Sequence, residues 1–493
     1  MPTIEEARRE VQSAFERART WSESDKKRSL WVFERELWTR MLALGRALMA
    51  LFLARQAARP RATEYRHDGV AWQLDGERSS EIGTRFGKVP FTRRVGRRLD
   101  VRRAACDLPI DRELGLCGGF SLGVVLAMTK LCAQMAFAGS RSAFRDSYEW
   151  TPSPRATLRM VDAVGDKARP FLEAAPPPED DGEILVLQVD GRGAPMITER
   201  ELGRRSQPHW RPDATERHVR RARRRVNRRG RPRRTKGKKS KNAKVAVAGV
   251  IYTLRRTPRG LEGPIHKRVY ATFESHEALF VWLHREAVKR GYGRKQTIFL
   301  ADGSEHIWDR QQRYFPDADV CLDWYHVVER IWSAGECLHD EGSAELNAWV
   351  EQQVQRLRRG ATQAVLRELR EELAATPRTG PGNKGRRERL EGQIKFFTNN
   401  LHRMNYAEFR RHDWDIGTGA AEGAMRNLIA MRLDGPGMRW SPDRAERVLH
   451  LRCVLLNGQW DDFAAYVAAR ESFTLAAQPM PTVPHAAKMR AAA

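Results

Sequence analysis

Two short apolar runs of the chain each end on an Asp-Gly pair. The first, ILVLQVDGRG (184–193), reaches Asp190, and the second, TIFLADGSE (297–305), reaches Asp302. An Asp-Gly pair alone is a common turn signal. Two carboxylates brought together repel each other unless a cation lies between them, and an oxygen-only site with few protein ligands suits Mg²⁺. If the two runs are neighbouring strands, these aspartates predict a metal site able to act on phosphodiesters.

A third acid, Glu422, lies just inside an expected helix that follows the segment GTG (417–419). The amino-terminal end of a helix favours a negative charge. Arg426 falls one turn later and Arg432 further along, where both are expected to face DNA phosphates. The alternative is a solvated Glu-Arg pair, which contributes only about 0.3–0.5 kcal/mol and explains neither the glycines nor the flanking apolar residues.

The segment ADVCLDWYH (318–326) carries a competing aspartate, Asp323, and a histidine, His326. We expect Asp302 to be the second metal ligand, because its strand is the fourth in order and is predicted to lie beside the strand of Asp190. The strand that ends at Asp323 is one position further away. Asp323 and His326 are therefore expected to position the metal ligands or DNA. A core histidine is an equally good interpretation of His326.

These acids need a scaffold, and residues 184–465 are expected to form one α/β domain. The pattern predicts three strands in sequence, then a helix capped by Ser275, then two more strands separated by a helix. That order is typical of an RNase H-like fold, a mixed five-stranded sheet flanked by helices in which the first and fourth strands are neighbours. A long helical insertion is expected at 327–411, before the helix that bears Glu422.

The chain before this domain is predicted to be mainly helical. Residues 1–60 form a helical segment, and residues 61–178 form a small β unit followed by helices. The helices near 140–150 and 153–168 are compatible with a helix-turn-helix that contacts DNA, or with simple packing. The Pro-rich acidic stretch APPPEDDGE (175–183) is a linker, and residues 466–493 form a C-terminal tail.

The chain of 493 residues carries a net charge of +26, which indicates a polyanionic partner. Residues 204–244 hold nineteen Lys and Arg against two acids, so +17 of that charge lies in one basic arm. The arm is too poor in apolar residues to fold alone, and we expect it to be disordered without nucleic acid. A solubilising loop or localisation patch is the alternative. The basic residues expected to contact DNA are Arg220, Arg221, Arg223, Arg224, Arg225, Arg228, Arg229, Lys238 and Lys239.

The remaining bulk features predict a protein of the cytoplasm, associated with the nucleoid. The N-terminus has no apolar signal region, and the longest apolar stretch, 122–139, is interrupted by Lys130 and Gln134. No membrane partner is expected. The six cysteines form no C-x-x-C pair, which argues against a disulfide framework and against a zinc site built from such pairs.

Taken together, residues 80–465 resemble the DDE transposases of bacterial insertion sequences, on the mutator-like side of that superfamily. The most specific part is IGTGAAEGAMRNLIAMRLDGPGMRWSPDRAERVLHLRCVLLNGQW (416–460), which is similar to the family's helix with the catalytic glutamate and the Gly-Met-x-Trp-Ser segment after it. VDGRG and LADGSEHIWDRQQRYFPDADVCLDWYH resemble the blocks with the two aspartates. TRFGKVPFTRR (84–94) and DLPIDRELGLCGGFS (107–121) resemble the N-terminal DNA-binding domain, but the C-x-x-C that relatives often carry between them is missing.

The resemblance implies a transposase that binds the ends of its insertion element, cleaves DNA and joins the 3′-hydroxyls to target DNA. Asp190, Asp302 and Glu422 would hold two Mg²⁺ or Mn²⁺ ions and act as the catalytic residues. Pairing of two double-stranded element ends implies a homodimer or a higher oligomer. A DNA-binding protein that has lost catalysis, or a metal-dependent nuclease that cuts without joining, are the alternatives.

Overall fold

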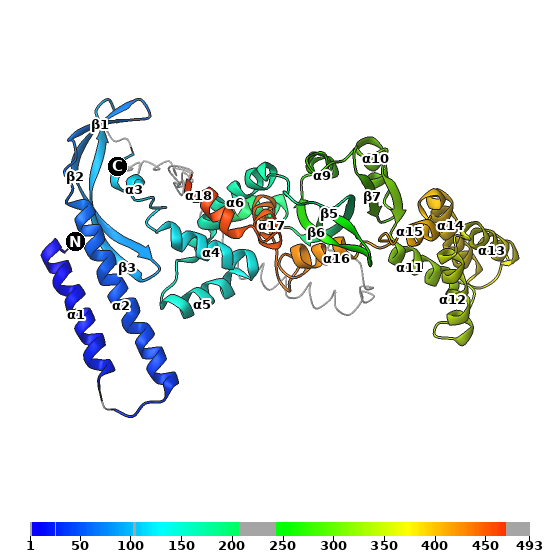
Figure 1. Cartoon of the computed structure of the whole chain (residues 1–493), viewed down its shortest axis with the longest axis horizontal. Coiled ribbons are helices and arrows are strands. Elements are labelled where there is room, and N and C mark those ends of the chain that lie inside the picture. The colour runs from blue at the N-terminus through cyan, green and yellow to red at the C-terminus, as the bar shows by residue number, and fades with distance from the viewer. Residues whose placement is uncertain (1, 25, 102–104, 207–242, 470–493) are drawn as a thin grey trace, which may run out of the picture. The chain divides into compact units, whose positions relative to one another are not determined.

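This computed structural model describes residues 2–24, 26–101, 105–206 and 243–469. The chain divides into two compact units, of which the first comprises residues 1–171 and the chain from Trp460 onward, and the second comprises residues 172–459. Figure 1 shows the elements of both units. Asp190, Asp302, Asp323, His326 and Glu422 all belong to the second unit. The predicted basic contacts from Arg220 to Lys239 lie outside the described residues, as does most of the C-terminal tail.

The first unit contains a helical hairpin, a three-stranded antiparallel sheet of order β1-β2-β3 and a group of helices. Its elements are α1 (Ile4–Ser22), α2 (Leu30–Ala57), β1 (Glu64–His67), β2 (Val70–Thr84), β3 (Gly87–Arg98), α3 (Pro109–Glu113), α4 (Leu122–Gln134), α5 (Phe137–Tyr148), α6 (Pro154–Ala174) and α18 (Trp460–Ala469). The expected N-terminal helices and small β unit are thus present. The DNA contact suggested for the segments now seen as α5 and α6 stays a prediction.

Trp21 holds the two helices of the hairpin together. Its ring stacks on Phe33 with centroids 4.7 Å apart, and its Nε1 donates to Glu36 at 2.8 Å. The Arg40 guanidinium lies 3.9 Å from the ring centroid, a cation–π contact. One side of α2 then packs on the sheet, where Leu53 lies in a buried cluster with residues of β2 and β3.

Among the described helices, α2 alone is long and apolar enough to cross a membrane by length and composition. A core helix of a soluble protein satisfies the same criterion. In α2 the residues Leu42, Ala47, Leu53 and Ala54 are buried inside the unit, so part of its apolar surface already has protein contacts.

The second unit is built on a five-stranded mixed sheet of order β6-β5-β4-β7-β8. Strands β4, β5 and β6 are antiparallel, and β7 and β8 run parallel to β4. The first and fourth strands of this domain are therefore neighbours, as predicted. The strands are β4 (Ile184–Pro195), β5 (Ala243–Thr257), β6 (Gly260–Thr272), β7 (Gln296–Ala301) and β8 (Asp319–Leu322).

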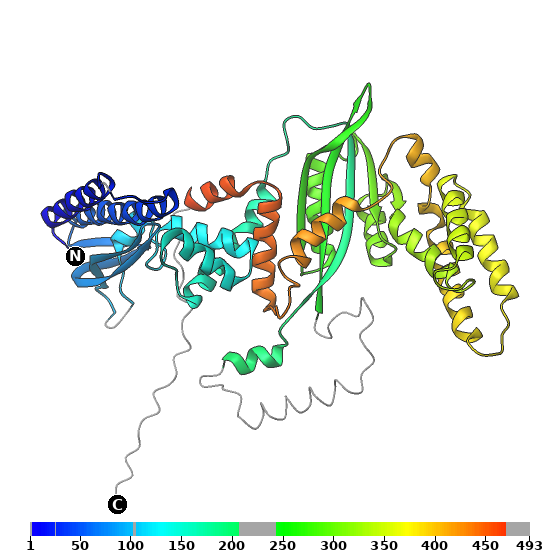
Figure 2. The same cartoon turned by 90° about the horizontal axis from the view of Figure 1, so that it is seen from below.

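Helices cover both faces of this sheet, with α9 and α10 on one face and α16 on the other (Figure 1). The helix α17 lies along the free edge of β6, where Asn457 accepts the Val269 N–H at 2.8 Å and Glu446 accepts the Phe273 N–H at 2.7 Å. Figure 2 shows the helices between β8 and α16, the expected insertion, grouped beyond one edge of the sheet. The helices are α7 (Glu199–Ser206), α9 (His276–Lys289), α10 (Glu305–Tyr314), α11 (Trp324–Gly335), α12 (Ala344–Arg358), α13 (Thr362–Ala375), α14 (Asn383–Asn400), α15 (Tyr406–Arg411), α16 (Gly419–Met425) and α17 (Pro442–Leu456).

Local signals explain why α9 forms where the sequence predicts it. The Ser275 hydroxyl accepts the Ala278 N–H at 3.1 Å and caps the helix. The predicted apolar positions Leu279, Phe280 and Leu283 are all buried. Gly249 of β5 allows the helix to approach, because a Cβ there would lie 3.2 Å from Leu279. The helix thus fixes one face of the sheet and leaves the other for α16.

One expectation about the strands is corrected. We expected Asp190 to end its strand, but β4 continues through Pro195 because β5 pairs with it along that whole length. Pairing with β7 stops at Val189 and Ala301, since β7 ends there. Asp190 therefore lies inside the long strand β4, at the level where the neighbouring strand β7 has ended and β5 still pairs with it.

Candidate functional site

Three aspartates lie at the same level of the sheet, on adjacent parallel strands. Val189 of β4 is paired with Ala301 of β7, and Ala301 is paired with Leu322 of β8. The next residue of each strand is an aspartate, namely Asp190, Asp302 and Asp323. Since carboxyl ends of parallel strands meet at one edge, this register brings the side chains of three separate segments together.

The period of the strand decides which face of the sheet these side chains share. Gln188 and Asp190 are two residues apart on β4 and so point to the same face. Gln188 contacts α16, because its Oε1 accepts the Ala421 N–H at 3.0 Å. Asp190 therefore faces the side of α16, the helix that carries Glu422.

Asp302 is held at the start of a tight turn. Its Oδ1 accepts the Ser304 N–H at 3.0 Å, and its backbone carbonyl accepts the Trp308 Nε1–H at 2.7 Å. A Cβ on the next residue, Gly303, would overlap the ring of Phe396 in α14. The helical insertion thus packs directly on the turn that presents Asp302, a contact that the sequence did not predict.

Asp323 is fully buried and hydrogen-bonds both to the start of α11 and to the residue before α16. Its Oδ2 accepts the His326 N–H at 2.9 Å and contacts His326 Nδ1 at 2.6 Å. Its Oδ1 accepts the Thr418 N–H at 2.6 Å, at the residue that precedes α16. Both oxygens therefore have donors from the protein, which suits the positioning role predicted for Asp323.

Gln188 also links the sheet to α16, a role that the sequence analysis did not predict. Its Nε2 donates to the Tyr252 hydroxyl at 3.0 Å and to the Gly417 carbonyl at 3.4 Å, while its Oε1 holds Ala421. Tyr252 in turn donates to Asp415. The available signal was a single polar residue inside the apolar run ILVLQV, since a fully buried amide requires hydrogen-bond partners. Together these contacts fix the segment from Asp415 into α16 against the sheet.

Glu422 completes the site from α16. Ligand atoms of Asp323, His326 and Glu422 all lie within 4.8 Å of one another, a spacing compatible with a metal ion. This group differs from the predicted set of Asp190, Asp302 and Glu422. The predicted set stays a prediction. In the group that the structure brings together, both oxygens of Asp323 already have protein donors, and the His326 ring has Asp323 as its partner.

Electrostatics at the site favour an additional positive charge. Burial, and after it the charges of Asp302 and Glu422, raise the pKa of Asp190 to about 6, although the Gly191 N–H and His326 act to lower it. The hydrogen bond to Asp323 raises the pKa of His326 to about 9. Although burial opposes its ionisation, the contacts with His326 and Thr418 hold the pKa of Asp323 below its usual range. A protonated His326 therefore balances part of the carboxylate charge.

The residues present fit a divalent cation such as Mg²⁺ or Mn²⁺. Carboxylate oxygens are the donors that these hard ions prefer. Asp190 provides the observation that tests this fit, because a half-buried carboxylate with raised pKa beside two other acids is stabilised by a cation. Asp190, Asp302 and Glu422 are the side chains that would hold the ions, with Asp323 and His326 beside them.

The two arginines predicted near Glu422 have different environments. Arg426 is exposed and follows α16 directly, so its side chain is accessible to a phosphate and the predicted contact stays a prediction. Arg432 is 1% exposed, and its guanidinium lies 4.7 Å from the centroid of the Trp440 ring. Arg432 is therefore part of the core, because the chain after α16 folds back onto the Gly-Met-x-Trp-Ser segment. The structure removes it from the residues expected to face DNA.

These features define an α/β protein with a carboxylate cluster at one edge of a mixed five-stranded sheet. No family model matches the chain, and no curated protein matches it. Among solved structures, it is similar to the Drosophila P element transposase strand transfer complex, with 11% identity, 69% of this chain covered, 79% of that chain covered and a TM-score of 0.23. At this TM-score the similarity establishes neither a fold nor an activity.

Proposed function

We propose that this protein is an RNase H-like DDE transposase that cleaves the ends of its own insertion element and joins their 3′-hydroxyls to target DNA. The observation that supports the proposal is the register of β4 and β7, because Asp190 and Asp302 directly follow the paired residues Val189 and Ala301, and the charges of Asp302 and Glu422 both act on Asp190. The strand order β6-β5-β4-β7-β8 supports the same fold, because it is the order expected of an RNase H-like sheet.

Each residue of the site then has a defined task. Asp190, Asp302 and Glu422 would hold two metal ions, which would supply activation of a water or 3′-hydroxyl and stabilisation of the leaving oxygen of the phosphodiester. Asp323 fixes the start of α16 through Thr418 and orients His326 through Nδ1. The exposed Arg426 contacts a DNA phosphate near the cut.

The DNA partner is double-stranded, at both the element ends and the target. The basic arm at 204–244 supplies most of the net charge and binds the DNA backbone without regard to sequence. The helices from α11 to α15 contact element DNA, and the protein acts in the cytoplasm on the nucleoid as a homodimer or a higher oligomer.

Strand transfer on labelled oligonucleotides tests this function. The substrates carry the inverted repeats found in the DNA that flanks the gene, and the reactions contain Mg²⁺ or Mn²⁺. Joined products that appear only with a divalent ion are expected. Cleaved but unjoined ends would instead indicate a nuclease, and binding without cleavage would indicate a DNA-binding protein that has lost catalysis.

A further inference from the structure

The helix α2 has an open apolar face with a regular spacing. Its exposed apolar residues include Leu30, Met41, Leu48 and Phe52, and the last three are each 46–49% exposed. Glu34 and Arg55 are also exposed. At 100° per residue these six side chains lie within about 60° of one another around the helix. We call Leu30, Glu34, Met41, Leu48, Phe52 and Arg55 the open face of α2.

The spacing on this face is that of a helix-pairing seam. Glu34, Met41, Leu48 and Arg55 follow one another at intervals of seven residues. Three residues after Glu34, Met41 and Leu48 come three half-buried leucines, namely Leu37, Leu44 and Leu51. Alternating steps of three and four residues over three heptads are the pattern by which two helices pack along their length.

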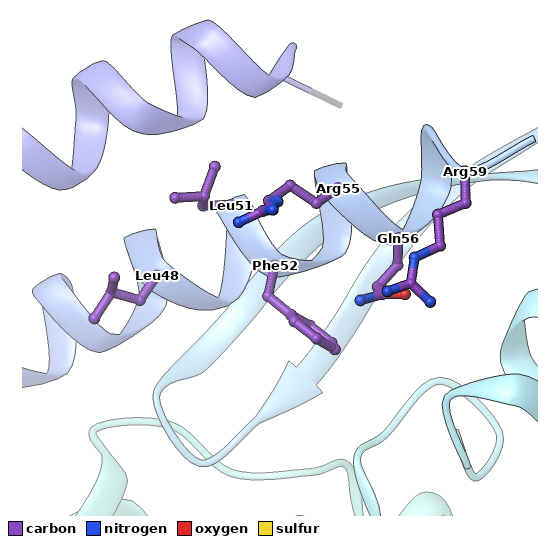
Figure 3. A pocket seen from close by; sticks show the side chains of 6 residues that line it. All are labelled: Leu48, Leu51, Phe52, Arg55, Gln56 and Arg59. Atoms are coloured by element: carbon purple, nitrogen blue, oxygen red, sulfur yellow. The ribbon is translucent and has the colours of Figure 1, made fainter.

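A recess at the C-terminal end of α2 continues the open face. It has a volume of about 420 Å³ and is lined by Leu48, Leu51, Phe52, Arg55, Gln56 and Arg59. Figure 3 shows these side chains, which all come from α2 and the turn after it. At the opposite end of the helix, Leu30 and Trp31 are 78% and 65% exposed. One end of the face therefore offers apolar side chains, and the other offers a recess bordered by arginines.

We propose that the open face of α2 binds the same face of a second copy of this chain, with the two helices antiparallel. The face is complementary to itself in that orientation. A two-fold axis between Leu44 and Gly45 places Glu34 opposite Arg55 of the second copy and Met41 opposite its Leu48. Each contact then occurs twice, as a two-fold interface requires.

Charge excludes the parallel orientation. Parallel helices in register would bring each residue opposite itself, so that Glu34 would face Glu34 and Arg55 would face Arg55. Like charges at facing seam positions destabilise a helix pair, whereas the antiparallel arrangement pairs opposite charges at both ends. It also brings Trp31 of each copy near Arg59 in the recess of the other, where a cation–π contact can form.

Two features make a second copy a better occupant than a lipid bilayer. The remaining sides of α2 pack on α1 and on the sheet, through Trp21–Phe33 and Leu53 among others. The open face also carries a glutamate and an arginine at seam positions, which a bilayer interior would penalise by several kcal/mol. The face is thus suited to protein contact, and its length of about 40 Å is sufficient for a stable helix pair.

The mass of the full chain in solution tests the pairing, independently of any catalytic activity. After nuclease treatment, sedimentation equilibrium should give twice the chain mass of 56.5 kDa at micromolar concentration. Met41→Glu with Leu48→Glu should give the single-chain mass with an unchanged far-UV circular dichroism spectrum, because both side chains are exposed and the fold of the single chain does not need them. Leu99→Glu, at another exposed apolar residue of the same unit, should leave the dimer intact.

A charge exchange tests the orientation. Glu34→Arg and Arg55→Glu should each weaken dimerisation by roughly tenfold or more, and the double variant should restore it to within about threefold of the original. A double variant weaker than either single variant would refute the antiparallel pairing. A chain that is monomeric throughout the micromolar range would overturn the proposal, as would binding of the monomer to phospholipid vesicles that Met41→Glu with Leu48→Glu abolishes.

Cross-linking distinguishes the two orientations directly. In a Cys106→Ser background, which removes the exposed cysteine, Met41→Cys combined with Leu48→Cys should form a disulfide between copies. Met41→Cys alone should not, because its counterpart in the second copy is Leu48. Efficient cross-linking of the single variant would show a parallel pair and contradict the proposal.

Discussion

At the scale of single residues, the site contains three aspartates that lie at the same level of the sheet but have different surroundings. Asp190 has a raised pKa and neighbours of like charge, whereas Asp323 has a lowered pKa and donors on both oxygens. A carboxylate without full protein partners is available to a metal ion, and one that is fully partnered positions other groups. This difference supports the roles proposed for the two aspartates and leads to two predictions.

The first prediction separates Asp302 from Asp323. Asp302→Asn removes a direct ligand, so no cleavage should be measurable at any Mg²⁺ or Mn²⁺ concentration. Asp323→Asn should retain weak activity that rises with Mn²⁺, because loss of a positioning group typically costs about 10–100-fold. The measurement is the cleavage rate on a labelled element end. If Asp302→Asn is the leaky variant and Asp323→Asn is dead, Asp323 is the ligand.

The second prediction concerns stability without metal. Because the pKa of Asp190 rises from 3.8 to about 6 on folding, the native state binds more protons than the unfolded state between these values. Stability from this group is therefore present below the lower value and lost as the pH rises through about 6. In EDTA, Asp190→Asn should melt about 2–4 °C above the unmodified protein at pH 7.5, and this gain should fade toward pH 4.

A control for this comparison is Asp461→Asn, at an exposed aspartate of α18, which should leave the melting temperature unchanged. Mg²⁺ should raise the melting temperature of the unmodified protein more than that of Asp190→Asn. A gain that is equal at both pH values would mean that burial of the Asp190 charge is not its cause.

At the scale of elements, the helical insertion supports the site that the sheet presents. Phe396 of α14 packs on Gly303, and the Arg330 guanidinium of α11 lies 4.6 Å from the centroid of the Phe396 ring. The Arg403 guanidinium lies 4.3 Å from the centroid of the ring of Trp308, whose Nε1 holds the carbonyl of Asp302. The turn with Asp302 is thus enclosed by residues of the insertion.

Gly303→Ala tests this support. The added Cβ would overlap the Phe396 ring and displace the turn, so cleavage should fall by about 10–100-fold while DNA binding is retained. Phe396→Leu in the same chain should restore part of the rate by making room. Gly392→Ala, in α14 with no atom within 4 Å of the new Cβ, is the matched control. A Gly303→Ala protein that cleaves normally would show that the insertion does not position Asp302.

Much of this arrangement could be predicted from the sequence, because local patterns determine the elements. The order of the expected strands and helices predicted that the strands of Asp190 and Asp302 are neighbours, and Ser275 predicted the start of α9. The contacts of Gln188 with Ala421 and of Gly303 with Phe396 could not be predicted, since they join segments far apart in the chain. The burial of Arg432 could not be predicted either, because it depends on how the segment with Trp440 folds back.

At the scale of the whole molecule, the charge is concentrated where the chain leaves the sheet. Pro195 of β4 pairs with Ala243 of β5, so the two ends of the intervening segment meet. Residues 207–242 within it contain sixteen Lys and Arg and two acids. A flexible linker that runs from Ser206 at the end of α7 to Ala243 can replace residues 207–242 at little cost to the hairpin.

Replacement of 207–242 by a Gly-Ser linker of the same length should weaken DNA binding equally at all sequences. It should also flatten the slope of log K against log salt by roughly 4 or more, since each phosphate contact contributes about 0.9 to that slope. Binding to element ends and to unrelated duplexes, each measured at several salt concentrations, checks this. The melting temperature should not change, and an unaltered salt slope would refute a role for the arm.

The central claim is that Asp190, Asp302 and Glu422 together hold the ions that cut DNA, and Glu422→Gln tests it most directly. The amide keeps the size of the side chain and removes one negative charge from the metal site. Glu329→Gln, at an exposed glutamate one turn after His326, removes the same charge outside the predicted ligands. Cleavage and joining of a labelled element end should fall by orders of magnitude in Glu422→Gln and stay near the unmodified rate in Glu329→Gln, with binding retained in both. A Glu422→Gln protein that cleaves at nearly the unmodified rate would contradict the claim.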